Sequence, residues 1–421
     1  MLNKTGQFKD YIVYGSGQVF NLVAPFIIAP YVIAVSGMEN WGRIGIALSV
    51  FTLLGIFIDF GSQLIGVKEL SINKGNTAKI KAQLDEVYTF RAIAFIVITV
   101  LLLGALLVLD LDYRLYLCGV AMLFSQFLNP LWIYQAFEEF TVINRIIILS
   151  KAIYLITVYV FVKDTDTYQY MLLCYGGANA AIYGFFLAKL YAKYHLSLFN
   201  VPVSRLVDNF RKEFPIVVSN FSISVYTYGP ILIVGELSGE YVAGIYHVGD
   251  MLLKIIRSYL SVFFNVSFPK FCSAFNADKE KGLNFLKTIN KYHLGLLAFG
   301  LFMAYVIVLL LLERVSISKE LHEGIVYGVK FLGIGFIIAL NIPFYQLLIY
   351  YNKQKSVSVI SVLGAIVMFM SCYLLTRAFS IDGSITSLYI VEVFITVSII
   401  IVCYKKVFSG GLRLQNLEGN K

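Results

Sequence analysis

The chain of 421 residues is 59% hydrophobic and only 14% charged, with a mean hydropathy of +0.78 and a formal net charge of +9. A soluble globular chain is about a quarter charged, so this composition excludes a soluble domain and predicts an all-α, polytopic membrane protein. The basic excess then reports membrane topology rather than a nucleic-acid partner, and the five cysteines form no metal-ligand spacing.

Twelve apolar segments are long enough to cross a bilayer, which takes about 20 residues in a helix. The first one follows Lys4 and Lys9 and lacks a small-residue cleavage site, so we expect a membrane span rather than a signal peptide. The expected spans are 11–36, 42–66, 87–109, 114–136, 146–163, 168–190, 215–236, 242–268, 292–313, 323–350, 357–378 and 383–404.

Positive charge is unevenly divided between the segments that join these spans. The longer polar loops, at 67–86, 191–214 and 269–291, hold most of the Lys and Arg residues, and the short turns on the opposite side hold few. Basic loops stay in the cytoplasm. The sequence therefore predicts that both termini are cytoplasmic.

Four charged residues within or near the predicted spans of the first half are candidates for a role in the site or in topology. Asp59, in the second span, is expected either to couple to protons or to cap the cytoplasmic end of that helix. Arg43, near the outer end of the same span, is either a substrate ligand or a side chain that extends to the interface. Arg91 and Lys151 lie near the cytoplasmic face, where we expect them to extend to the interface.

The two halves of the chain resemble each other in the order of their motifs. This order predicts a duplication into two parallel six-helix bundles, 1–200 and 201–421, with the substrate path between them. The pairs at one constant offset are Ser36 and Ser238, Gly37 and Gly239, Gly42 and Gly244, Lys68 and Lys270, and Lys79 and Lys281. At a larger offset, Asn129-Pro130 and Tyr134-Gln135 echo Asn341, Pro343 and Tyr345-Gln346.

The eighth span, within Leu237–Phe271, carries Asp250, Lys254 and Arg257 near its middle. At about 100° per residue, these side chains fall within roughly 60° of one another on a helix. A charge at the centre of a bilayer costs about 3 kcal/mol or more, so the stripe faces either a polar transport pathway or another helix. If Asp250 and Lys254 form an i,i+4 ion pair that only packs between helices, Arg257 is left without an acidic partner.

Two further charged residues occupy spans of the second half. Lys330, two turns into the tenth span, is either a substrate ligand or a side chain that extends to the interface. Glu392, in the twelfth span, is isolated among apolar residues and requires either a basic partner or a proton of its own. The sequence leaves both alternatives open.

Five stretches resemble one family of transporters over most of the chain. They are IIAPYVIAVSGMENWGRIGIA, IDFGSQLIGVKELS, NPLWIYQAFEEF, SVYTYGPILIVGELSGEYVAGIYHVGDMLLKI and FPKF. The sequence is similar to the Wzx-type oligosaccharide (O-antigen) flippases of the multidrug/oligosaccharidyl-lipid/polysaccharide exporter superfamily. The resemblance implies two six-helix bundles around a central cationic cavity in the bacterial inner membrane. It also implies an undecaprenyl-pyrophosphate oligosaccharide as cargo, with a polysaccharide polymerase and a chain-length regulator as partners.

This resemblance places Lys254 and Arg257 in the lumen, as expected ligands of the pyrophosphate. Two basic side chains in a low-dielectric cavity suit a compact anion of this kind. Asp250 is their expected orienting or proton-exchanging partner, and Arg43 and Lys330 are second choices as ligands. We expect neither a cofactor nor a metal, and no nucleotide-binding P-loop is present.

Two other functions compete with the flippase. An ion-coupled multidrug exporter of the same superfamily would need lumenal carboxylates for cationic drugs, yet basic residues outnumber acids on the eighth span. A membrane glycosyltransferase or polymerase could use the strings Asp110-Leu111-Asp112 and Asp164-Thr165-Asp166 to bind metal–nucleotide sugars. Both strings fall in short outer turns, where we expect ordinary solvated residues.

Overall fold

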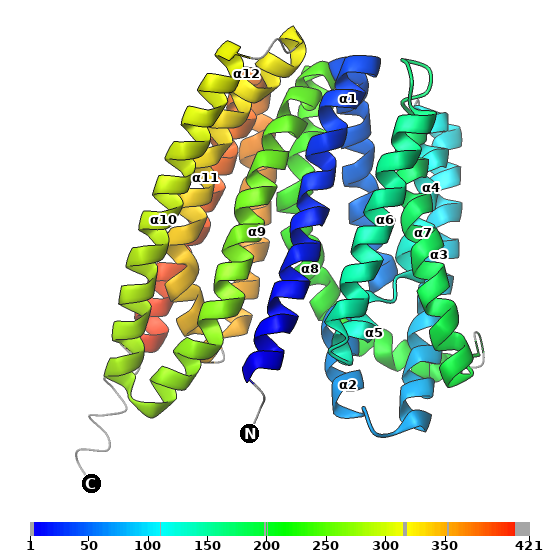
Figure 1. Ribbon diagram of the computed structural model, residues 1–421, viewed down its shortest axis with the longest axis vertical. Coiled ribbons are helices and arrows are strands. Elements are labelled where there is room, and N and C mark those ends of the chain that lie inside the picture. The colour runs from blue at the N-terminus through cyan, green and yellow to red at the C-terminus, as the bar shows by residue number, and fades with distance from the viewer. Residues whose placement is uncertain are drawn as a thin grey trace. The chain divides into compact units, whose positions relative to one another are not determined.

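The computed structural model describes residues 4–109, 111–197, 199, 201–314, 318–351 and 353–408, which form helices joined by short turns (Figure 1). Within those ranges no strand occurs, so the predicted all-α class is confirmed. The helices, with two π-helical segments (η), are α1 (Lys4–Asp59), η1 (Ser62–Gly66), α2 (Val67–Ile72), α3 (Thr77–Val108), α4 (Tyr113–Leu128), α5 (Leu131–Ala136), α6 (Phe140–Phe161), α7 (Tyr170–Tyr194), α8 (Val203–Ser238), α9 (Glu240–Ala277), α10 (Lys279–Arg314), α11 (Lys319–Tyr350), α12 (Gln354–Cys403) and η2 (Tyr404–Phe408).

In the described part of the chain, nine helices are long and apolar enough to cross a membrane. Two of them exceed a single crossing. α1 is interrupted at Gly37 and α12 at Ser380, between the spans predicted at 11–36 and 42–66 and those predicted at 357–378 and 383–404. The chain is therefore a multi-pass membrane protein, and the total of twelve spans stays a prediction.

The three segments predicted as polar loops are largely helical. Segment 67–86 contains α2 and the start of α3, and 191–214 contains the end of α7 and the start of α8. Segment 269–291 consists of the end of α9 and the start of α10, which meet at Asp278. The loop prediction is wrong because a helix keeps its own backbone hydrogen bonds beyond the hydrocarbon core, where polar side chains are solvated.

The helices group into two compact units, Met1–Ser224 and Val225–Lys421, which we call unit 1 and unit 2. In unit 1, α4 packs mainly on α7, and α1 on α6. In unit 2, α11 packs on both α9 and α12. The division between the units falls inside α8, and the expected bundles 1–200 and 201–421 stay a prediction.

The packing of α9 against α11 depends on a glycine. A Cβ atom at Gly249 would lie 2.4 Å from Phe331 Cε2, so this close approach requires a residue without a side chain. Phe331 is fully buried, and its ring meets that of Tyr246 edge-on at 5.2 Å between centroids. Because Tyr246 and Gly249 belong to the same turns as Asp250, this contact helps to set the direction of the charged stripe on α9.

The predicted internal repeat is visible in the backbone at two glycines. Gly37 adopts φ 87° and ψ 164°, and Gly239 adopts φ 85° and ψ 168°. This region is open almost only to glycine. The two positions match at the constant offset seen in the sequence, and each separates two helical segments. The two halves thus share a local backbone geometry at these positions, and the duplication into two six-helix bundles stays a prediction.

The same offset relates two helix N-termini. Asn76 Oδ1 accepts a hydrogen bond from the backbone N–H of Lys79 at 3.0 Å, at the start of α3. Asp278 Oδ1 accepts one from the backbone N–H of Lys281 at 3.3 Å, at the start of α10. Each side chain thereby satisfies an N–H group that has no partner within its helix.

The second set of matched motifs does not share a backbone structure. Asn129 and Pro130 separate α4 from α5. Asn341 and Pro343 instead lie inside the continuous helix α11. The sequence echo at these positions therefore does not extend to local geometry.

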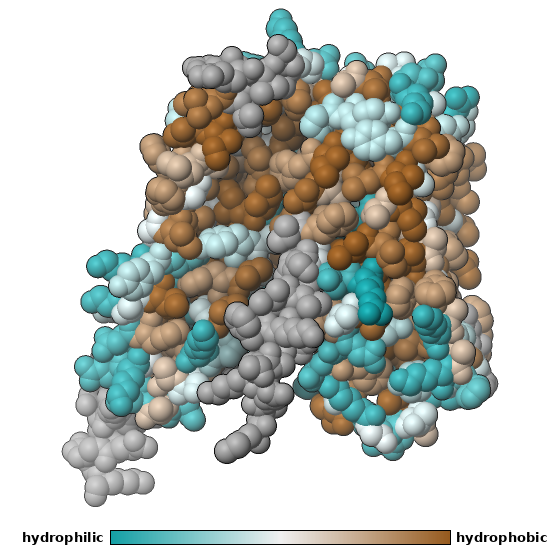
Figure 2. Space-filling model, in the orientation of Figure 1, coloured by the Kyte–Doolittle hydropathy of each residue, from teal (hydrophilic) through white to brown (hydrophobic). Residues whose placement is uncertain are grey.

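Side-chain polarity agrees with a position in a membrane. On the face of unit 1 seen in Figure 2, apolar side chains cover the middle of the helices, and polar side chains gather at the lower end, around α2 and α5. A bilayer buries about 30 Å of hydrocarbon-facing surface and leaves the ends of the helices in water.

Candidate functional site

The charged stripe on α9 forms two ion pairs within unit 2. Lys254 Nζ lies 2.7 Å from Asp250 Oδ2, one turn earlier on the same helix. Arg257 Nη2 donates a hydrogen bond to Glu392 Oε1 of α12 at 3.1 Å. The stripe is therefore neutralised in part by its own helix and in part by a helix that lies far along the chain.

Burial is unequal across these two pairs. The carboxylate side chains are only 9% exposed at Asp250 and 4% at Glu392, whereas 36% of the Lys254 side chain and 20% of the Arg257 side chain remain exposed. A guanidinium group has five N–H donors, and among the described residues Glu392 alone accepts one from Arg257. Both cations thus keep donors and surface for a further anion.

Two tyrosines of α8 lie beside the cations. Lys254 Nζ is 5.3 Å from the ring centroid of Tyr228, and Arg257 Cζ is 6.0 Å from that of Tyr226. At these distances the electron-rich ring faces stabilise the positive charges. Sequence analysis did not select either tyrosine. The string SVYTYG places both on α8, but only the tertiary structure brings them to α9.

This geometry answers two questions that the sequence left open. Asp250 pairs with Lys254, as expected for an i,i+4 ion pair on one helix. Arg257 also has an acidic partner, because Glu392 of α12 pairs with it. Glu392 thereby has the basic partner that an acid in an apolar span requires. One signal in the sequence pointed to this pair. Pairing Asp250 with Lys254 leaves Arg257 without an acid on α9, and Glu392 has no basic residue near it on α12.

A second buried charge cluster lies in unit 1, at the end of α1. Arg91 Nη2 donates to Asp59 Oδ1 at 2.5 Å, and Ser62 Oγ donates to the same oxygen at 2.7 Å. Arg91 Nη1 donates to the backbone carbonyl of Asn129 at 2.7 Å. This carbonyl lies at the break between α4 and α5, and Tyr88 also donates to it.

The expectation that Arg91 and Lys151 extend to the membrane interface is wrong. Arg91 has no exposed surface, and its two terminal nitrogens donate to Asp59, Ser62 and the carbonyl of Asn129 inside the unit. Lys151 is also buried, with its ammonium 4.2 Å from the ring centroid of Tyr175. Asp59 therefore acts as the partner of a buried cation, which sequence analysis did not consider.

The two second-choice ligands are both engaged in ion pairs. Arg43 pairs with Glu39 at 2.9 Å, one turn earlier on α1. Lys330 pairs with Asp382 at 2.6 Å, and its ammonium lies 4.6 Å from the ring centroid of Tyr327. Lys330 does not join the cluster on α9, and the roles of both residues as substrate ligands stay predictions.

The acidic strings behave as turn residues where the structure describes them. Asp112 caps α4 by accepting the N–H of Leu115 at 3.2 Å, and Asp110 lies outside the described residues. Asp164 is exposed and accepts the hydroxyl of Thr167 at 2.8 Å, which holds the pKa of its carboxyl below the ordinary value. Among the residues that the structure describes, no group of His, Cys, Asp and Glu could hold a metal ion.

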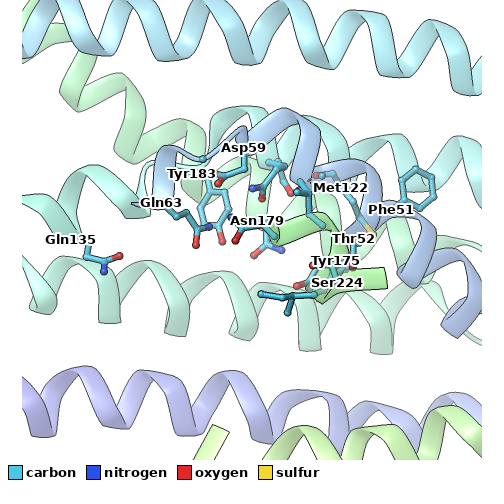
Figure 3. Close-up of a pocket in the computed structure, with 17 residues that line it drawn as sticks. Phe51, Thr52, Asp59, Gln63, Met122, Gln135, Tyr175, Asn179, Tyr183 and Ser224 are labelled. Atoms are coloured by element: carbon cyan, nitrogen blue, oxygen red, sulfur yellow. Dashed lines mark hydrogen bonds between the residues drawn. The ribbon is translucent and has the colours of Figure 1, made fainter. Parts of the chain in front are cut away.

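Unit 1 also contains a cavity of about 650 Å³. Helices α1, α4, α5, α7 and α8 line it, together with η1 and the residues next to it. Figure 3 shows Asp59, Gln63, Asn179 and Tyr183 pointing toward one another from three of these elements, with Gln135 to one side. The cavity is open enough and polar enough to hold water or a hydrophilic ligand.

A multi-pass helical chain with embedded ion pairs and a polar cavity among its spans has the architecture of a membrane transporter, not of an enzyme. Comparison with known proteins gives the same class. The chain belongs to the polysaccharide biosynthesis protein family (Polysacc_synt), which matches residues 8–275.

Individual relatives extend this likeness over nearly the whole chain. A protein of Escherichia coli (strain K12) named as an O-antigen transporter is 22% identical over 404 residues, which cover 94% of this chain and 96% of that protein. Among solved structures, the lipid II flippase MurJ in an inward closed conformation has a TM-score of 0.68 at 13% identity, covering 93% of this chain and 87% of MurJ.

A multidrug resistance MATE family transporter of the MOP superfamily, in an inward-facing conformation, has a TM-score of 0.64 at 12% identity. The match covers 97% of this chain and 99% of that transporter. At this level of identity the two structural likenesses show the fold alone. They leave the cargo of this chain to be argued from its own residues.

Proposed function

We propose that the chain is a flippase for lipid-linked oligosaccharides, which moves undecaprenyl-pyrophosphate-linked sugar units across the bacterial inner membrane by alternating access. The observation that carries this proposal is the pair of cations on α9, Lys254 and Arg257, each held by a nearly buried carboxylate and each still partly exposed. Membership of the polysaccharide biosynthesis family and the O-antigen transporter relatives support the same cargo class.

The chemistry of the stripe suits a pyrophosphate. Lys254 and Arg257 lie one turn apart, so one compact dianion could contact both. Arg257 offers N–H groups in a planar fork that matches phosphate oxygens, and Lys254 adds a point charge. Asp250 and Glu392 hold the two cations in place when no cargo is bound, and they lower the cost of keeping those cations within a membrane.

The proposal includes an orientation and partners. Both termini would lie in the cytoplasm, where the lipid-linked unit is made, and the sugar would leave on the outer side. A polysaccharide polymerase and a chain-length regulator would act on the delivered units. Arg43 and Lys330 would serve as weaker ligands at other depths along the path.

Leaflet exchange in reconstituted vesicles tests this proposal. The probe is a fluorescent undecaprenyl-pyrophosphate oligosaccharide, and the measured quantity is the rate at which it becomes accessible to a membrane-impermeant quencher. We expect Lys254→Ala and Arg257→Ala each to slow exchange by about 10- to 100-fold, because each variant loses a charge-assisted contact of about 1.5–3 kcal/mol. Lys189→Ala removes an exposed lysine of α7 as the matched control and should exchange at the wild-type rate.

Loss of Arg257 alone leaves Glu392 buried without its partner, which could unfold the protein. The double variant Arg257→Gln with Glu392→Gln removes both charges and keeps a neutral hydrogen-bonding pair, so we expect it to insert and melt normally and still fail in exchange. Wild-type exchange by this folded double variant would remove Arg257 and Glu392 from the mechanism. Drug export with no lipid exchange by the wild-type protein would instead favour the multidrug alternative.

A further inference from the structure

The cavity of unit 1 differs in chemistry from the stripe on α9. Its described lining holds amide and hydroxyl side chains from five helices and η1, and no Lys or Arg. They include Thr52 of α1, Gln63 of η1, Gln126 of α4, Asn179 of α7, and Asn220 and Ser224 of α8. Polar groups of this number are costly within membrane spans unless they have a use there.

Two of these side-chain amides have no hydrogen-bond partner among the described residues. Among the described residues, none forms a hydrogen bond with the side-chain amides of Gln126 and Asn179. Asn179 is only 5% exposed, yet it lines the cavity, so its amide is directed at the enclosed space. A carboxamide offers two donors and an acceptor with two lone pairs. These groups can therefore donate to and accept from the same ligand.

The cavity is close to neutral. Asp59 is the one acidic residue in its described lining, and Arg91 already neutralises it with a 2.5 Å contact. A phosphate would find no described basic side chain there, and a cationic drug would find a carboxylate that is already paired. The ligand that best fits this lining is therefore uncharged and carries many hydroxyl groups.

The internal repeat gives an independent argument. At the offset that relates Gly37 to Gly239, Thr52 and Gly55 of α1 correspond to Lys254 and Arg257 of α9. Both Thr52 and Gly55 line the cavity. At these two positions the repeated helix is thus cationic in unit 2 and uncharged in unit 1. The two repeats would then provide different sites, one for an anion in unit 2 and one for a neutral ligand in unit 1.

We infer that the cavity of unit 1 binds the sugar part of the cargo and that it selects neutral oligosaccharides over acidic ones. Its volume of about 650 Å³ lies within the usual range of about 300–1,000 Å³ for ligand pockets. The rings of Tyr175 and Tyr183 supply flat faces for sugar C–H groups. This inference rests on the proposed function for its ligand, whereas the site itself is defined by unit 1 alone.

Cysteine protection tests the site in the full-length protein. Ser224→Cys and Thr52→Cys each place a small thiol in the lining, and peptide mass spectrometry reads its alkylation separately from that of the five native cysteines. Three ligands are compared: undecaprenyl pyrophosphate, the same lipid carrying a neutral trisaccharide, and the free trisaccharide. We expect the two sugar ligands to slow alkylation about ten-fold at ten times their dissociation constants, and the bare lipid to leave it unchanged.

Asn179→Leu should raise the apparent dissociation constant of the sugar ligands about five- to ten-fold, because an amide that contacts the sugar is lost. Asn40→Leu, on the part of α1 outside the lining, is the matched control and should leave protection unchanged. A trisaccharide with a terminal uronate should protect less well than the neutral one. Equal protection by both, or an Asn179→Leu variant that binds like the wild type, would overturn the inferred selectivity.

The outcomes separate this inference from the proposed function. If neither sugar ligand slows alkylation while Arg257 still governs leaflet exchange, the sugar site is wrong and the flippase proposal stands. If the free trisaccharide protects a protein that does not exchange the lipid, the sugar site is supported and the proposed cargo is wrong.

Discussion

At the scale of single residues, the buried charges Arg91, Asp250 and Glu392 are tolerated because each has a partner of opposite charge on the protein. Arg91 is enclosed by Asp59, Ser62 and the carbonyl of Asn129, and its guanidinium also lies 5.8 Å from the ring centroid of Trp132. A fully buried cation of this kind is stable only while its hydrogen-bond acceptors stay in place. The cluster therefore fixes where α1 ends against α3 and the break between α4 and α5.

Replacing Arg91 should destabilise unit 1 strongly. Arg91→Ala leaves Asp59 without its counter-charge inside the protein, and we expect a loss of about 3–5 kcal/mol in the free energy of unfolding. Arg145→Ala removes an exposed arginine of α6 and should stay within about 0.5 kcal/mol of the wild type. Thermal melting in detergent, followed by circular dichroism, measures the difference. Equal melting temperatures for the two variants would contradict a structural role for the Asp59–Arg91 pair.

At the scale of elements, two glycines decide where continuous helices break. Gly37 divides α1, and Gly239 separates α8 from α9, with nearly identical backbone angles. An added Cβ atom would meet nothing within 4 Å at either position, so glycine is required there by the backbone conformation and not by packing. By contrast, α1 continues without a break through Pro25 and Pro30.

Alanine at these glycines should be costly despite the open space around them. We expect Gly37→Ala and Gly239→Ala each to lower the free energy of unfolding by about 1–3 kcal/mol, because φ near +85° with an extended ψ strains any residue with a Cβ atom. Gly104→Ala in α3 is the matched control, since it also has nothing within 4 Å but lies in a regular helix. There alanine should be neutral or stabilising by up to about 1 kcal/mol. Melting temperatures in detergent compare the three variants, and a loss at Gly104 as large as that at Gly37 would refute the backbone explanation.

At the scale of the whole molecule, the net charge of +9 is concentrated in the polar extensions of the helices and not in the spans. The α9–α10 junction at Asp278 belongs to the basic side, and the turn between α6 and α7 belongs to the side with few basic residues. Because basic segments are retained in the cytoplasm, these charges predict a cytoplasmic side for the α9–α10 junction and an outer side for the turn between α6 and α7.

Reporter fusions test this assignment. We expect a green fluorescent protein fused to the C-terminus to fluoresce, and an alkaline phosphatase fused there to be inactive, since it folds only outside the cytoplasm. A phosphatase inserted at Asp164, in the exposed turn between α6 and α7, should be active. A fusion after Asp278 should be inactive and controls for leakage. An active phosphatase at the C-terminus would reverse the predicted topology or make the number of crossings odd.

Much of the fold was predictable because a membrane span is specified by residues that are consecutive in the chain. Hydropathy over about 20 residues indicates a span without reference to the rest of the chain, and most predicted spans overlap a helix. Helix ends were less predictable, as at 269–291, because no local signal marks where a helix leaves the membrane and continues in water. For the site, the spacing of Asp250, Lys254 and Arg257 was sufficient to place them on one stripe, since one helix determines it.

The sequence by itself determined that the chain spans a membrane many times, that several motifs recur at a fixed offset and that α9 carries a charged face, because each of these depends on residues close together in the chain or on that offset. Only the tertiary structure decided that Glu392 neutralises Arg257, that Arg91 is buried on Asp59, and that amides from four helices meet around one cavity. The physical reason is that partners separated by 32 or 135 residues meet through helix packing, which no local pattern of hydropathy or charge encodes.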